Sequence, residues 1–210
     1  MKSGKNKWVI LVLGTIGAIV ALTTIGLSFV NSSMRDRTRR ETSEVYSSYV
    51  NADLEKRNNG AQILIVIQDR TQRSPADAGT GILNGIRNLL FGNLLPKNRV
   101  RSIAADTYRN FVLRNLWPEF LHDSDFKLAV RHKIATAAET SLYGQQEFDR
   151  LFPEGYGYFT LSSVGFNSSH TEAYFYAEHQ FGLAGHGNYV LMRKIDGNWQ
   201  TVETKYAWIS

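Results

Sequence analysis

Glu178, His179 and His186 are the densest group of side chains that could transfer protons or bind a metal ion. The two histidines lie on either side of a glycine-rich hairpin loop, and such a loop could bring both imidazoles to one ion. No HExxH-type spacing is present, and adjacent residues on a strand point to opposite faces, which separates Glu178 from His179. Residues 178–187 are therefore either ordinary loop and surface residues or the centre of a hydrolase or metal-dependent enzyme.

Asp69 and Arg70 form the second candidate site, in this case for binding a ligand. They follow the apolar run Ile63 to Ile67, and loops after buried strands often carry binding groups. The alternative is a local turn with an exposed ion pair, which contributes little to stability. The chain contains no cysteine, nucleophile elbow, phosphate loop or dinucleotide fingerprint. We therefore expect no cofactor and no metal, and we favour a binding function over an enzymatic one.

An apolar segment from Trp8 to Val30 precedes these candidates. Every residue in it is apolar, Gly, Thr or Ser, and at 1.5 Å per residue its helix would cross about 30 Å of hydrocarbon. This length favours an uncleaved membrane anchor over a cleaved signal peptide, whose apolar region is roughly 7–15 residues long. We expect residues 1–7 to be a cytoplasmic tail and the C-terminal domain to be extracytoplasmic, periplasmic or at the cell surface.

The charge of the chain is concentrated beside this segment. Residues 1–40 carry seven of the 24 Lys and Arg residues and one acidic residue, Asp36, although the formal net charge of the whole chain is only +5. Basic and acidic residues nearly balance in the remainder, so the basicity belongs to the flanks of the expected anchor. A nucleic-acid partner is not expected, because such binding requires a basic surface on the folded domain.

The remaining chain has the length and the 43% apolar content of one ordinary domain. We expect a juxtamembrane helix over 31–57, a buried strand over 63–67, and mainly helical segments over 82–95, 104–117 and 124–151. Four strands are then predicted between turns, at Tyr158–Phe166, Thr171–Phe181, Tyr189–Lys194 and Trp199–Ile209. The predicted fold class is α+β: a single domain, 58–210, with helices and one strand first and an antiparallel meander over 156–210 last.

Residues 82–101 combine an apolar helical pattern with basic residues directly after it, Lys97, Arg99 and Arg101. An apolar helix beside a basic cluster can lie on an anionic lipid surface. The alternative is a helix that packs on the core with a solvated basic tail.

The C-terminal segment resembles a group of uncharacterised exported bacterial proteins whose chains end in a similar β-meander. The matching residues are Val164 to Asn167, Gly182 to Gly187, Tyr189 to Leu191, Lys194, Asp196 to Trp199 and Trp208 to Ser210, together with Ile65 to Thr71. The resemblance implies export and a fold more than an activity. Members of the group often carry a cysteine pair near the glycine-rich loop, where this chain has Phe181 and Ala184, so no redox role is carried over. We expect a membrane-tethered envelope module that binds a protein or an envelope component.

Overall fold

The computed structural model describes residues 34–56, 63–72, 100–141, 144–182 and 184–210. The chain divides into two compact units, Met1–Glu41 and Thr42–Ser210, and the second contains the sheet and its core. The predicted membrane segment Trp8–Val30 and most of residues 82–101 lie outside the described residues. Within the described residues, no helix is long and apolar enough to cross a membrane.

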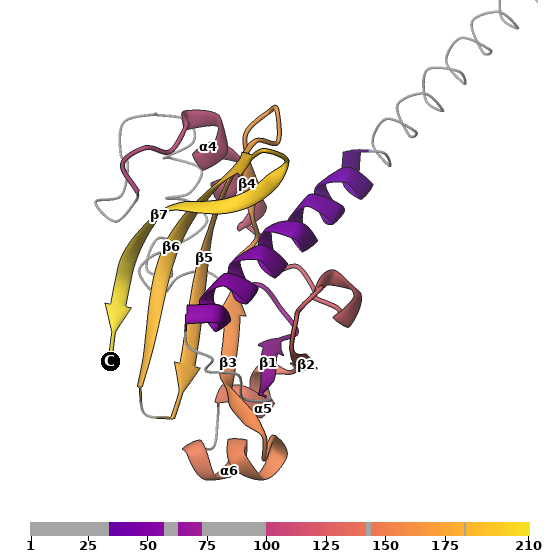
Figure 1. The fold of residues 1–210 in the computed structure, drawn as a ribbon, viewed down its shortest axis with the longest axis vertical. Coiled ribbons are helices and arrows are strands. Elements are labelled where there is room, and N and C mark those ends of the chain that lie inside the picture. Colours follow the sequence, from indigo (N-terminus) through magenta and orange to yellow (C-terminus); the bar gives the residue numbers. More distant parts are fainter. Residues whose placement is uncertain (1–33, 57–62, 73–99, 142–143, 183) are drawn as a thin grey trace, which may run out of the picture. The chain divides into compact units, whose positions relative to one another are not determined.

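A seven-stranded mixed sheet organises the larger unit (Figure 1). Its strands are β1 (Leu64–Gln68), β2 (Arg131–Ala135), β3 (Gly155–Leu161), β4 (Gly165–Phe166), β5 (Glu172–Phe181), β6 (Ala184–Ile195) and β7 (Asn198–Ile209). The spatial order is β2-β1-β3-β5-β6-β7, with the short β4 also paired to β5. β1 is parallel to both of its neighbours, whereas β3, β5, β6 and β7 pair antiparallel.

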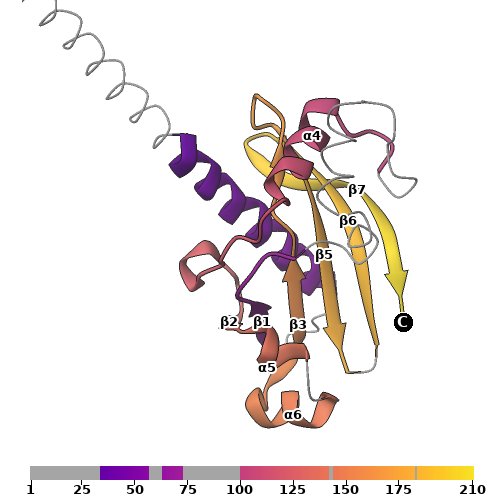
Figure 2. The ribbon, with the colours of Figure 1, turned by 180° about the vertical axis from the view of Figure 1, so that it is seen from behind.

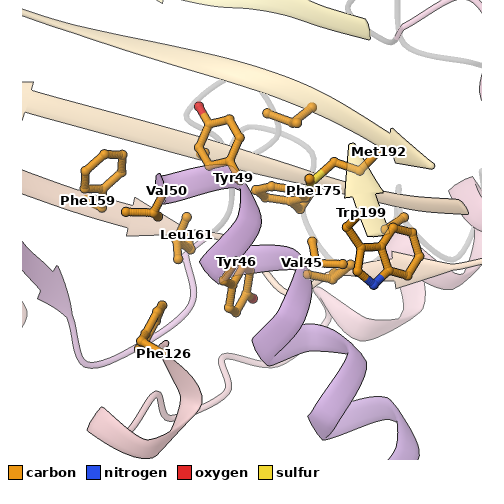
Figure 3. Close-up of a cluster of buried hydrophobic side chains, with 14 of the residues drawn as sticks. Val45, Tyr46, Tyr49, Val50, Phe126, Phe159, Leu161, Phe175, Met192 and Trp199 are labelled. Carbon is orange, nitrogen blue, oxygen red and sulfur yellow. The ribbon is translucent and has the colours of Figure 1, made fainter. Parts of the chain in front are cut away.

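The first face of the sheet is covered by the helix over residues 34–56, from Thr42 onward. An apolar stripe at helical spacing, Val45, Tyr46, Tyr49, Val50 and Leu54, is buried against β1, β3, β5 and β6 (Figure 3). The rings of Tyr46 and Tyr49 both pack edge-on against Phe175 of β5, with ring centroids 5.8 and 5.3 Å away. This helix is therefore part of the domain core.

The second face is covered by short helices, seen from behind in Figure 2. Phe111 of α4 (Ala105–Arg114) packs with Tyr174, Tyr176 and Leu191 of the sheet. Phe148 of α6 (Gly144–Leu151) packs with Val66 of β1 and Ala135 of β2, which are parallel strands. The 3-10 helix η1 (Asp123–Asp125) and α5 (Ala137–Ser141) lie before and after β2.

The predicted fold class is wrong. Residues 131–135, expected to be helical, form β2, and β3, assigned to an antiparallel meander, is also the parallel neighbour of β1. The sheet is therefore one mixed structure with helices inserted between its strands, instead of a helical region followed by a separate meander. Apolar spacing along a short segment does not identify a distant pairing partner, and Arg131–Ala135 is a strand because it pairs with β1, although only Ala135 of the five is buried.

Candidate functional site

His179 and His186 meet across the β5–β6 hairpin. They are directly opposite each other in the antiparallel register, and their ring centroids are 6.0 Å apart at an interplanar angle of 72°. The segment expected to be a loop is mostly paired strand: β5 runs to Phe181 and β6 begins at Ala184. The two imidazoles are thus held by the ladder instead of by a loop.

Aromatic rings enclose His179, whose exposed fraction is only 1%. Phe159, its cross-strand neighbour on β3, stacks on it with a centroid distance of 4.1 Å and an angle of 14°. Tyr156 and Phe181 lie near the same ring, at 6.0 and 5.3 Å. His186 is also buried, although less completely. The position of the His179 ring is therefore determined by packing on several sides.

Asp53, on the helix over 34–56, is the acidic residue of this site. Its Oδ2 atom lies 3.5 Å from Nδ1 of His179, which is an ion-pair distance but longer than an ordinary hydrogen bond. The candidates predicted from the sequence do not include Asp53, yet a signal existed. The residue continues the helical spacing of Tyr46, Tyr49 and Val50, so a carboxylate occupies a position in the apolar stripe. We call Asp53, His179 and His186 the imidazole site.

Neither ring nitrogen of His179 has a hydrogen-bond partner among the residues that the structure describes. A buried polar atom without a partner carries a desolvation penalty of about 1–3 kcal/mol, so such a group calls for a ligand, an ion or a water molecule. An imidazole beside a carboxylate can accept a proton or donate a lone pair to a metal. In the described part of the chain, no three His, Cys, Asp or Glu side chains are grouped to hold a metal ion.

Glu178 does not belong to the imidazole site, because it faces the other side of the sheet. Its carboxylate accepts hydrogen bonds from the Tyr176 hydroxyl at 2.9 Å and from the Gln180 amide at 2.6 Å. The indole of Trp208 donates in turn to the Tyr176 hydroxyl at 2.7 Å. Burial, together with the nearby charge of Glu178, raises the pKa of Tyr158. Glu178 therefore has a structural role: its carboxylate connects the Tyr176 and Gln180 side chains by hydrogen bonds.

Asp69 and Arg70 directly follow β1, which lies two strands away from β5 and His179 in the sheet. The guanidinium of Arg70 lies over the ring of Phe120, 4.6 Å from its centroid, and both side chains are exposed. The backbone of Asp69 bonds to Ala135 and Leu121, which connects β1 to the segments around β2. Arg70 also forms an isolated antiparallel bridge with Phe120, and Oδ1 of Asp69 is buried without a hydrogen-bond partner among the described residues.

No protein-family model, curated protein or solved structure matches the chain.

Proposed function

We propose that this protein is a single-pass, membrane-tethered module of the cell envelope that binds a protein partner through the sheet end carrying the imidazole site. The apolar segment Trp8–Val30 supports the tether, and the resemblance of the C-terminal segment to exported bacterial proteins supports an extracytoplasmic domain. Contact of residues 82–101 with anionic lipid remains a proposal from the sequence.

The observation that carries this proposal is a group of exposed apolar side chains around buried polar ones. Ile209 lies opposite His186 in the ladder and is 67% exposed, and Tyr206, on the same strand, is 63% exposed. Tyr156, near His179, is also exposed. Exposed apolar side chains gathered on one surface mark interaction sites, and tyrosine is frequent among the residues that dominate binding.

Photo-cross-linking in intact cells tests the proposed surface. A photoreactive phenylalanine analogue placed at Tyr206 or Ile209 of the full-length protein should give the same discrete cross-linked band. The analogue at Ile195, which is exposed at the far end of β6, serves as the matched control. Bands from all three positions, or from none, would contradict docking at this surface.

Protease accessibility tests the tether separately. The domain should be digested in spheroplasts but not in intact cells if it is periplasmic, and in both if it lies at the cell surface. The protein should also retain its first residues in the membrane fraction. Protection from protease in spheroplasts would contradict the extracytoplasmic placement.

The contact between Asp53 and His179 favours a second candidate, a hydrolytic enzyme in which His179 acts as a general base. Asp53 would then be a positioning residue that orients the ring. Hydrolysis of ester or peptide substrates by the purified full-length protein, lost in His179→Gln and reduced in Asp53→Asn with a shifted pH profile, would support this candidate. A His179→Gln variant with an unchanged rate would exclude His179 as the base.

A further inference from the structure

We propose that His179 and His186 bind one divalent transition-metal ion of the zinc class, with Asp53 orienting His179. This inference concerns the same surface as the proposed docking function and rests on it only for the biological role of the ion. Binding of the ion itself depends on the imidazole site alone.

The ladder places the two imidazoles at a distance that suits chelation. Directly opposed residues of an antiparallel pair have Cβ atoms about 4.5–5.5 Å apart, which lets two side chains reach a common point. With zinc–nitrogen distances of about 2.0–2.1 Å, two imidazoles on one ion have ring centres roughly 5–6 Å apart. The observed centroid distance of 6.0 Å is at the upper end of this range, so a small rotation of the less buried His186 ring would complete the pair.

The surroundings of His179 match those of a metal-binding histidine. Metal-ligating histidines commonly donate one ring N–H to a carboxylate, which fixes the tautomer and makes the other nitrogen a better ligand. Asp53 lies on the Nδ1 side at 3.5 Å. Nε2 has no hydrogen-bond partner among the described residues, although the side chain is almost completely buried. The proposed ion would give this nitrogen the partner that the described residues do not supply.

Two protein ligands leave coordination positions open. A tetrahedral zinc ion takes four ligands, and the described residues offer no third side chain to the group. The remaining positions would hold water or a side chain of the docked partner, such as an imidazole or a carboxylate. The exposed Tyr206 and Ile209 would surround that contact. The ion would thus serve as a polar anchor at the centre of an apolar surface.

Calorimetric titration of ZnCl2 into the full-length protein, purified in detergent and freed of metal by a chelator, tests the proposal. We expect saturation at one ion per chain. His179→Ala and His186→Ala should each abolish saturable binding, and Asp53→Asn should weaken the affinity about 10- to 100-fold, as is usual for such orienting carboxylates. His122→Gln, at an exposed histidine near η1, should bind as the wild type does.

Circular dichroism of each variant separates a lost ligand from a lost fold. Should His179→Ala unfold, the less deeply buried His186→Ala decides the question alone. Absence of saturable zinc binding by the wild type, or wild-type affinity in folded His186→Ala, would overturn the metal site. Zinc binding without cross-links from Tyr206 would overturn only the docking surface, whereas cross-links without zinc binding would overturn only the ion.

Discussion

Close packing and local hydrogen bonds explain why particular glycines and polar residues occupy their positions in the C-terminal segment. A Cβ atom at Gly165 would overlap the backbone of Phe111 in α4, and one at Gly187 would overlap the Tyr176 hydroxyl and the Trp208 indole. Asn167 accepts backbone N–H groups of Thr171 and Glu172 at 2.8 and 3.0 Å, which closes the turn before β5. These residues support the fold and do not line the imidazole site.

At the residue scale, Gly187→Ala should destabilise the protein by about 1–3 kcal/mol, because the added methyl group displaces Tyr176 from its hydrogen bonds. Urea unfolding measures the change. Gly197→Asn is the matched control: Gly197 has a φ of 82° in the β6–β7 turn, a Cβ atom added there would meet nothing within 4 Å, and asparagine tolerates this conformation. Equal stability of Gly187→Ala and the wild type would contradict the close packing around Gly187.

At the element scale, the helix over 34–56 connects the core with the imidazole site. Tyr46 lies in its apolar stripe and donates a buried hydrogen bond of 2.8 Å to the Ser162 carbonyl, just after β3. Two turns further along the same helix, Asp53 reaches His179. Movement of this one helix would therefore disturb both the packing of the first face and the charge beside the imidazoles.

Tyr46→Phe should lower the free energy of unfolding at pH 7 by about 1–3 kcal/mol, since the buried Ser162 carbonyl loses its donor. Burial raises the pKa of Tyr46 well above its ordinary value of about 10. Its contribution is thus fully present below about pH 10 and declines at higher pH, because the unfolded chain releases the proton first. Unfolding at about pH 9 and pH 11 should show a smaller decline in the variant than in the wild type. Equal declines would contradict this role of Tyr46.

At the scale of the whole molecule, the two faces of one sheet contribute side chains to two separate hydrophobic clusters. On β5, Phe175 faces the helix over 34–56 while its neighbours Tyr174 and Tyr176 face α4. The central strands β5 and β6 therefore contribute side chains to both faces, and neither face can lose its packing without loosening the strands that the other face needs. We expect the unit Thr42–Ser210 to unfold as a single cooperative structure.

Two substitutions on opposite faces test this cooperativity. Phe175→Ala and Phe111→Ala should each destabilise the protein by about 3–5 kcal/mol, the usual effect of deleting a buried phenylalanine ring. Both should shift the same transition when urea unfolding is followed by tryptophan fluorescence and by far-ultraviolet circular dichroism. Phe120→Ala, at an exposed ring, should change stability by less than about 1 kcal/mol. Two separate transitions would contradict a shared sheet.

Much of the local structure follows from the sequence. The β-branched run at 63–67 corresponds to β1, the turn at Asp196–Gly197 joins β6 to β7, and the stripe around Tyr46 is one face of a helix. The period-two geometry of a strand also predicts correctly that Glu178 and His179 face opposite sides. Each of these features depends on residues close together in the chain, so their spacing is sufficient to predict them.

Only the tertiary structure decided which distant segments meet. The parallel pairing of β1 with β2 and β3, and the position of Asp53 beside His179, join segments far apart in the chain. Such contacts depend on which faces bury the most apolar surface together, and a single sequence carries no period or motif that identifies the partner. The sequence alone therefore predicted β1, the C-terminal strands and the candidate histidines, but not β2, and only the tertiary structure placed Asp53 instead of Glu178 beside His179.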